Sequence, residues 1–199
     1  EEIERVAPVI EAVKARFDVP VSIDSYKAKV AAAAIEAGAD LVNDIWGLKY
    51  DPEMAGLIAR TGVVCCLMHN KNNTEYQDFY PDMLRETAEC VKLAKEAGIA
   101  DDKIILDPGV GFGKNYEQNL ETILHMERFH ELGYPMLLGT SRKSVIGLTL
   151  DLPADQRVEG TLVTTMFGVQ KGCMFVRVHD VKENVRTIKM CEAILNSGK

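Results

Sequence analysis

Residues 19–45 read VPVSIDSYKAKVAAAAIEAGADLVNDI, and they contain a short apolar run, a longer alanine-rich run and a second short apolar run. The two short runs are rich in β-branched residues and have the length of buried strands, whereas residues 27–38 have the period of a helix. Gly38 ends that helix, where a left-handed C-cap is favoured. This stretch therefore predicts a strand, a helix and a second strand in succession.

The same alternation continues to the end of the chain. Six strands are predicted, at residues 19–24, 39–45, 63–68, 103–107, 135–140 and 174–180. A helix follows each strand, most clearly at residues 27–38, 81–98 and 180–195, and Gly98 ends the second of these. Repeated units of this kind specify a parallel sheet with helices outside, arranged either as an open doubly wound sheet or as a (β/α)8 barrel.

Of the two arrangements we favour the barrel, because nearly every predicted strand ends in a hydrogen-bonding side chain and a barrel gathers these ends at one mouth. An open sheet would concentrate them at a single switch point. A complete barrel has eight strands and typically about 250 residues, whereas this chain has 199 residues and begins inside a predicted helix, residues 1–17. We expect strands 3 to 8 of an α/β (β/α)8 TIM barrel, a single domain over residues 1–199 that lacks the first two strands.

Composition argues against several classes of protein. The chain is 47% hydrophobic and 27% charged, as in ordinary globular proteins, and no apolar run approaches the roughly 20 residues of a membrane helix. We expect a cytoplasmic protein with no membrane partner, and the net charge of −7 disfavours nucleic acid. The five cysteines are scattered like reduced core residues, without the spacing of a zinc site.

The last predicted strand, residues 174–180, carries Arg177 and His179 on one face. A buried arginine requires an anion. That anion is either an internal carboxylate, Asp24 or Asp44, or a ligand. Because a guanidinium binds phosphate through two parallel hydrogen bonds and a histidine two residues later adds a donor, we favour a diphosphate site.

Three further polar residues, Asp24, Asn43 and Asp107, lie at or near the ends of predicted strands. Each could simply cap the turn or helix that follows. Together they offer carboxylate acceptors and an amide that both donates and accepts, which suits the amino and oxo groups of a guanine-like ring. The set therefore suggests a flat, nitrogen-rich heterocycle as ligand.

Two loops follow the fourth and fifth strands. Residues 106–115, LDPGVGFGKN, match neither the Walker phosphate loop nor the dinucleotide fingerprint. We expect a mobile glycine loop with Phe112 as a stacking lid. Residues 137–147, LLGTSRKSVIG, are dense in donors; they are either a solvated basic loop or a site in which Lys143 reaches the ligand and Ser144 holds a carboxylate.

In order along the chain, the segments IDSYKAKVAAAAIEAGADLVNDI, LDPGVGFGKN, LGTSRKSVIG, EGTLVTTMFGVQKGC and FVRVHDV resemble the dihydropteroate synthase family. The resemblance implies a (β/α)8 barrel, usually a homodimer, that acts in folate synthesis. Such enzymes join 6-hydroxymethyl-7,8-dihydropterin diphosphate to p-aminobenzoate and release pyrophosphate, assisted by Mg²⁺. The family's metal-binding asparagine lies in an N-terminal motif that this sequence does not contain, so no metal ligand is expected within it.

The resemblance also assigns roles to residues by motif. Those that would hold the pterin are Asp24, Asn43, Asp107 and Lys143, with Ile45, Met68, Phe112 and Gly139 lining it. Those that would bind the diphosphate are Arg177 and His179, and Ser144 would meet the carboxylate of p-aminobenzoate, with Lys143 and Phe112 beside its ring. Asp24, Lys143 and Arg177 are the expected catalytic residues.

Two alternatives remain open from the sequence. One is a pterin-binding methyltransferase domain, which would not need the SRKS segment or the Arg177 and His179 pair because it binds no diphosphate. The other is a truncated barrel that binds pterins without catalysis.

Overall fold

The computed structural model describes residues 1–198, which form two compact units. The first unit contains Glu1–Asn70 and Leu84–Leu106, and the second contains Lys71–Met83 and the chain from Asp107 onward. Each unit is described separately below. Among the described residues, no helix is long and apolar enough to cross a membrane.

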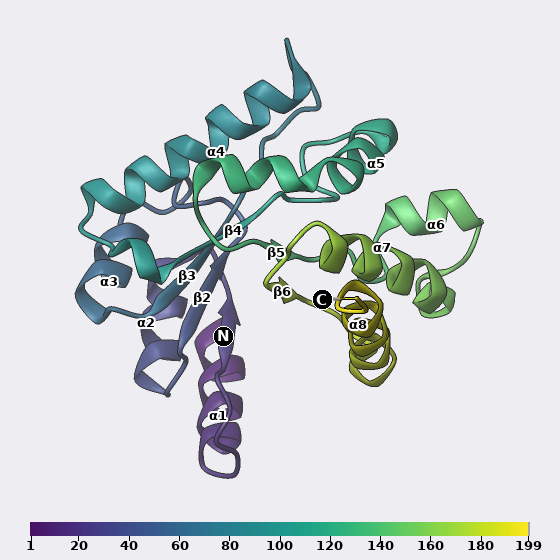
Figure 1. Ribbon diagram of the computed structural model, residues 1–199. Helices are drawn as coiled ribbons and strands as arrows, with labels where there is room; N and C mark the ends of the chain where they lie inside the picture. The colour runs from purple at the N-terminus through teal and green to yellow at the C-terminus, as the bar shows by residue number, and fades with distance from the viewer. Residues whose placement is uncertain (199) are drawn as a thin grey trace. The chain divides into compact units, whose positions relative to one another are not determined.

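The first unit is built on a parallel sheet with the strand order β1-β2-β3-β4 (Figure 1). Its strands are β1 (Ser22–Asp24), β2 (Leu41–Asp44), β3 (Val64–Met68) and β4 (Ile104–Asp107), whose last residue belongs to the second unit. Val42, Cys65, Leu67 and Leu106 are fully buried in it. Near-continuous burial along β2, β3 and β4 is typical of a parallel sheet covered on both faces.

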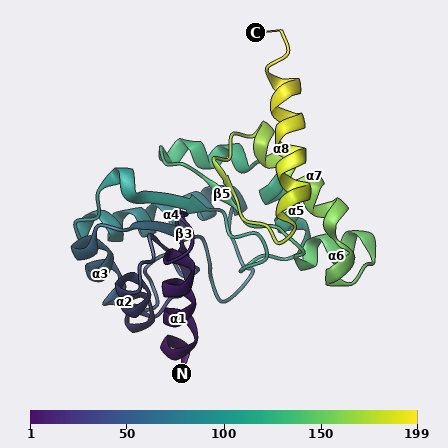
Figure 2. The same cartoon turned by 90° about the horizontal axis from the view of Figure 1, so that it is seen from below.

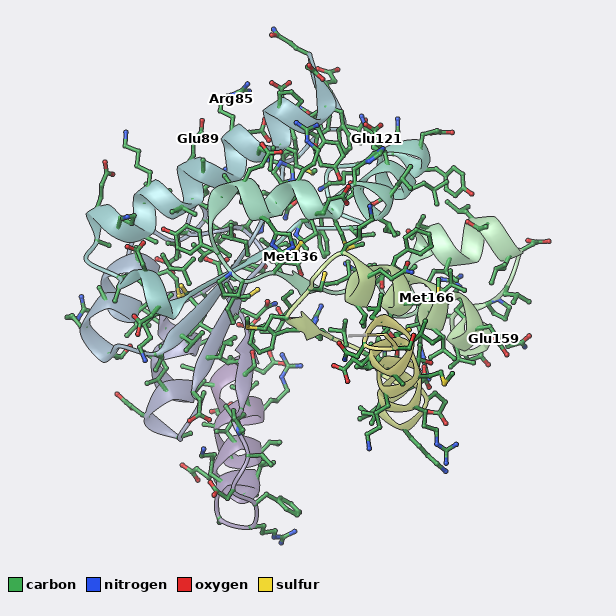
Figure 3. The ribbon with its side chains drawn as sticks, viewed as in Figure 1. Arg85, Glu89, Glu121, Met136, Glu159 and Met166 are labelled. Atoms are coloured by element: carbon green, nitrogen blue, oxygen red, sulfur yellow. The ribbon has the colours of Figure 1, made fainter. Side chains whose placement is uncertain are left out.

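The helices of the first unit follow the pattern that the sequence predicts. They are α1 (Glu2–Lys14), α2 (Ala28–Glu36), α3 (Met54–Thr61), a 3-10 turn η1 (Asp101–Lys103) and most of α4 (Phe79–Glu96). Gly38 and Gly98 follow α2 and α4 with φ of 108° and 91°, so both glycines have the left-handed conformation expected of them. Arg85 and Glu89, one turn apart on α4, point outward to solvent (Figure 3).

The second unit pairs two short parallel strands, β5 (Leu137–Leu138) and β6 (Phe175–Val176). Its helical elements are α5 (Tyr116–Leu124), η2 (Met126–Leu132), α6 (Ser144–Leu150), η3 (Ala154–Gln156), α7 (Val158–Gln170) and α8 (Val181–Leu195). Helices α7 and α8 lie side by side (Figure 2). Met136, just before β5, is fully buried (Figure 3), as is Phe129.

The α/β class with parallel strands is confirmed, and all six predicted strands exist, each followed by a helix. The prediction for residues 174–180 is wrong in its extent, because β6 ends at Val176. Arg177 continues the ladder by one hydrogen bond, from its N–H to Leu138 O at 2.9 Å, and the chain then turns toward α8. A single domain over residues 1–199 stays a prediction.

Two reciprocal hydrogen bonds cap the N-terminus of helix α5, which follows the loop after β4. Asn115 Oδ1 accepts from Gln118 N at 2.8 Å, and Gln118 Oε1 accepts from Asn115 N at 2.8 Å, which is a capping box. We expect Asn115→Ala to lower the free energy of unfolding by about 1 kcal/mol. Urea unfolding followed by circular dichroism measures this change.

Because the two side chains act as one cap, Gln118→Ala combined with Asn115→Ala should cost less than the sum of the single changes. Glu117→Ala, an exposed change in the same turn, is the matched control and should change little. Strict additivity of the two cap changes would contradict a reciprocal box.

Candidate active site

In the first unit, three neighbouring strands end in polar or sulfur-containing side chains. Asp24 and Asn43 are directly opposite each other in the β1 and β2 register, and Met68 ends β3. Asn43 is 5% exposed, and its Oδ1 is buried without a hydrogen-bond partner anywhere in residues 1–198. An unsatisfied buried acceptor is costly, so this oxygen marks a position where a ligand donor would be favourable.

Asp44, next to Asn43, has a structural role. Its two carboxylate oxygens accept from Trp46 N and Leu48 N, each at 2.9 Å, and hold a tight turn in which Leu48 has a φ of 70°. Burial raises the pKa of Asp44, and these two N–H groups partly offset the rise. Asp44 therefore shapes the turn that begins at Ile45, one of the predicted pterin-lining residues.

Asp24 is exposed, in contrast to Asn43. It lines a hollow of about 210 Å³ together with side chains of α1 and the start of α2. Beside it, Lys27 Nζ and Glu2 Oε1 form an ion pair of 2.7 Å. The β1 end thus presents a carboxylate that a ligand could reach.

In the second unit, Asp107 is the most constrained of the predicted residues. Its side chain is 3% exposed, and its Oδ1 accepts from Gly109 N at 2.7 Å. Burial raises the pKa of Asp107, although Lys143, the Gly109 N–H, Arg177 and Lys114 all act to lower it. The carboxyl group therefore lies in a desolvated position surrounded by cations.

Gly139 lies close to both Asp107 and Arg177. A Cβ added at Gly139 would lie 3.5 Å from Asp107 Oδ2 and 3.6 Å from Arg177 Nε. A cavity of about 120 Å³ adjoins this point and is lined by Gly139, Ser141, Lys143, Arg177, Val178 and His179. The predicted diphosphate residues and the predicted lysine thus share one small polar cavity.

The loop after β4 holds Lys143 in place. Lys143 Nζ donates to Val110 O and lies 4.8 Å from the centroid of the Phe112 ring, within reach of a cation-π interaction. A Cβ at Gly111 would lie 3.2 Å from Lys143 Cδ, so the glycine lets the lysine stem pass close to the backbone. Phe112, predicted as a lid over a ligand, contacts this ammonium group.

Internal hydrogen bonds tie the loop at residues 106–115 to itself and to α5, and its predicted mobility stays a prediction. Lys114 is 8% exposed, and its Nζ donates to Gly109 O and Phe112 O, each at 3.0 Å. Asn119 on α5 accepts from Gly111 N and donates back to the end of the loop. The glycines here serve close packing and positive φ, at 69° for Gly109 and 90° for Gly111.

The prediction that Arg177 is a buried strand residue is wrong. Arg177 and His179 are exposed and lie beyond β6, although they still share one side of the chain because Val178 between them is half-buried. Arg142, in the loop after β5, holds Asp180 with two hydrogen bonds of 3.1 Å and 2.6 Å. This pair lowers the pKa of Asp180 and joins the loops after β5 and β6.

The predicted site residues therefore fall into two groups. Those in the first unit are Asp24, Asn43, Ile45 and Met68. Those in the second are Asp107, Phe112, Gly139, Lys143, Ser144, Arg177 and His179. Ser144, the predicted carboxylate ligand, is exposed at the first residue of α6.

Two residues that matter in the second unit, Lys114 and Ser141, were given no role from the sequence. They lie within residues 106–115 and 137–147, and were covered there only as part of those segments. The position of Lys114, directly after the glycine-rich loop, could have indicated its role. The backbone carbonyl groups of such a loop need hydrogen-bond donors, and a lysine supplies them. Nothing in the sequence signals the contact of Ser141 with His179.

No metal centre is found in the part of the chain that the structure describes. No group of three or more His, Cys, Asp or Glu side chains could hold an ion there. The five cysteines form no disulfide, and burial raises the pKa of Cys65 and of Cys173 to about 12. Thiols of this kind are not the oxygen ligands that Mg²⁺ prefers.

Comparison with known proteins gives a consistent result. Residues 1–179 match the family model described as pterin binding enzyme. The chain is 60% identical to the dihydropteroate synthase of Clostridium beijerinckii and 52% identical to that of Bacillus subtilis, over 98% and 100% of this chain and 73% and 70% of theirs.

Solved structures agree with the sequence relatives. A dihydropteroate synthase from Clostridium difficile, in the presence of pteroic acid, matches 96% of this chain and 73% of its own with a TM-score of 0.95 and 45% identity. The Yersinia pestis enzyme in a sulfonamide drug complex matches 98% of this chain and 73% of its own, with a TM-score of 0.94 and 38% identity.

The raised pKa of Asp107 predicts how its replacement affects stability. Because the pKa of Asp107 is higher in the folded state than in the unfolded state, the folded state binds this proton more tightly. The stabilisation that proton binding gives is fully present below the ordinary aspartate pKa, and it is lost as the pH rises through the pKa of the folded state. Asn stays neutral and can still accept from Gly109 N. We expect Asp107→Asn to raise the free energy of unfolding at neutral pH.

Urea unfolding from about pH 4 to pH 8 checks this expectation. The advantage of the Asp107→Asn variant over the unchanged chain should grow with pH and then level off. A variant that is less stable by a constant amount at every pH would show that attraction to the cations outweighs desolvation.

Proposed function

The chain belongs to the dihydropteroate synthases, a family of pterin-binding transferases, and we propose that the side chains described above in each unit bind its substrates. In the proposed reaction, 6-hydroxymethyl-7,8-dihydropterin diphosphate and p-aminobenzoate give 7,8-dihydropteroate and pyrophosphate. The assignment of individual residues rests on the polarity, burial and contacts found in each unit.

The pterin site is supported chiefly by the unpartnered Oδ1 of Asn43, a buried acceptor suited to a ring N–H. The buried carboxyl of Asp107 adds an acceptor for the amino and ring N–H groups of the pterin. Asp24 supplies a further carboxylate at the end of β1. Ile45, Met68, Phe112 and Gly139 line the flat ring in this proposal.

The diphosphate site is supported by the cavity that Lys143, Arg177 and His179 line. A guanidinium and an ammonium attract the anion, and the exposure of Arg177 leaves its guanidinium accessible to a ligand. The absence of a diphosphate in the methyltransferase reaction makes this cation-rich cavity an argument for the synthase.

The chemistry follows from the charges at the two ends of the substrate. The bond between the pterin methylene carbon and the diphosphate oxygen breaks, and its electron pair leaves with pyrophosphate. The amine nitrogen of p-aminobenzoate then attacks the carbon and loses a proton. Asp24 stabilises the positive charge that develops on the pterin, while Arg177 and His179 stabilise the departing anion and Lys143 contacts the pterin.

The second substrate, p-aminobenzoate, is assigned to residues at and beside the start of α6. We assign its carboxylate to Ser144, and we place its ring beside Lys143 and Phe112. The Clostridium difficile enzyme was solved in the presence of pteroic acid, and the Yersinia pestis enzyme in a sulfonamide drug complex. These relatives support an arylamine site of this kind.

Magnesium, a homodimer and a cytoplasmic location complete the proposal. Mg²⁺ would supply further charge neutralisation for the diphosphate when it is bound, and no cluster of three or more His, Cys, Asp or Glu side chains in residues 1–198 is available to hold it. Exposed aliphatic side chains on α8, among them Met190 (61%) and Ile194 (59%), support a second copy as partner.

Asn43→Leu tests the pterin site. Replacing an unsatisfied buried amide by an apolar side chain should leave the free energy of unfolding unchanged or raise it, while affinity for the dihydropterin diphosphate falls about tenfold or more. Calorimetric titration and urea unfolding measure the two effects. Asn184→Leu is the matched control, because Asn184 is equally buried but hydrogen-bonded to Thr165 and Asp180.

The control should lose about 1–3 kcal/mol of stability, since it leaves those partners unsatisfied. Unchanged pterin affinity in a folded Asn43→Leu variant would remove Asn43 from the site.

Asp24→Asn tests the catalytic role of this carboxylate. Because the positive charge develops only in the transition state, turnover should fall by about 100-fold or more while dissociation of the dihydropterin diphosphate changes only a few-fold. Pyrophosphate release is measured with and without p-aminobenzoate. Equal losses in affinity and turnover would contradict the role, and release that never depends on p-aminobenzoate would favour a non-catalytic module.

A further inference from the structure

Ser141 lies in the loop between β5 and α6 and contacts the predicted diphosphate residue His179 twice. Its Oγ lies 2.9 Å from His179 Nδ1 and accepts from the His179 backbone N–H at 3.1 Å. Ser141 is 8% exposed, whereas His179 is exposed. A buried hydroxyl therefore holds an accessible imidazole through both its backbone and its ring.

The position of the hydroxyl hydrogen determines the state of the ring. The backbone N–H of His179 can only donate, so it occupies one acceptor position of Ser141 Oγ. Within residues 1–198, Nδ1 of His179 is the remaining partner of this hydroxyl. If Nδ1 carried a hydrogen, Oγ would accept two hydrogen bonds, and the Ser141 hydrogen would have no acceptor among the described residues, only solvent in the cavity that Ser141 lines. For a hydroxyl on a residue that is 8% exposed, this arrangement is the less favourable one. Ser141 thus donates to Nδ1, and the neutral ring carries its hydrogen on Nε2.

The loops after β5 and β6, which carry Ser141 and His179, are also joined by hydrogen bonds that do not involve these two residues. Arg142, which follows Ser141 with a φ of 59°, donates to both carboxylate oxygens of Asp180, which follows His179. Its carbonyl oxygen accepts from Arg157 Nη1 at 2.9 Å, and its N–H donates to Thr161 Oγ1 at 3.2 Å. The hydrogen bonds of Arg142, directly after Ser141, therefore help to keep Ser141 within hydrogen-bond distance of the imidazole.

We propose that Ser141 is a positioning residue that holds neutral His179 in the tautomer with hydrogen on Nε2. His179 then offers a donor to the cavity that it lines with Lys143 and Arg177. The inference rests on the proposed function, in which this cavity receives the diphosphate. A neutral donor at Nε2 hydrogen-bonds a phosphate oxygen without first taking up a proton, whereas the other tautomer would present a lone pair to the anion.

Nitrogen-15 NMR of the full chain tests the tautomer directly. At a pH about two units above the ordinary histidine value of about 6.5, the imidazole nitrogens report which one carries hydrogen. The His179→Asn spectrum assigns the signals. We expect the Nε2–H form in the unchanged chain, a mixture in Ser141→Ala, and restoration of the Nε2–H form in Ser141→Thr, which keeps a hydroxyl.

Steady-state kinetics separates this role from a general loss of structure. Ser141→Ala should raise KM for the dihydropterin diphosphate about tenfold, the scale of one hydrogen bond to a charged group, and leave KM for p-aminobenzoate unchanged. Ser144→Ala, three residues later at the start of α6, should raise KM for p-aminobenzoate and leave the His179 tautomer unchanged. Circular dichroism confirms that each variant is folded.

Two results would overturn the inference: an Nδ1–H ring in the unchanged chain, or an unaltered tautomer in folded Ser141→Ala. A tautomer that shifts while KM for the diphosphate substrate stays constant would instead refute the assignment of His179 to the diphosphate. The NMR result thus tests Ser141, and the KM result tests the proposed function.

Discussion

The second unit is organised around a carboxyl group that is buried at the end of β4. Asp107 loses its hydration there, and one backbone N–H together with nearby cations compensates only in part, so its pKa stays raised. Desolvation of this carboxyl group therefore works against the stability of the fold. In the proposed function, the same burial keeps water away from the hydrogen bonds between this group and the ligand.

The cations around Asp107 are themselves fixed by backbone. Lys143 donates to Val110 O and faces the ring of Phe112, and the buried ammonium of Lys114 holds two carbonyl groups of the same loop. Lys114 thus stabilises the conformation of the loop whose Val110 carbonyl group binds Lys143. Preorganisation of this kind lets charges act on a ligand without reorganising at the moment of reaction.

Much of the fold followed from local patterns. The strands β1 to β6 and their helices were predicted because apolar runs and helical periods are properties of neighbouring residues, and Gly38 and Gly98 because a left-handed cap favours glycine whatever packs against it. The extent of β6 was not predictable in this way. Its end depends on Leu138 and Ser141, which take the backbone hydrogen bonds of Arg177 and His179.

The sequence alone determined the α/β class, the family and which residue types stand at the strand ends, because these depend on composition, period and motif order. Only the tertiary structure decided that the glycine loop is tied by Lys114, that Arg177 is exposed, that Asn43 has an unpartnered oxygen and that Ser141 contacts His179. Each of these depends on which atoms from distant parts of the chain come within hydrogen-bond distance. Burial and pairing are properties of that three-dimensional neighbourhood, and spacing along the chain does not encode them.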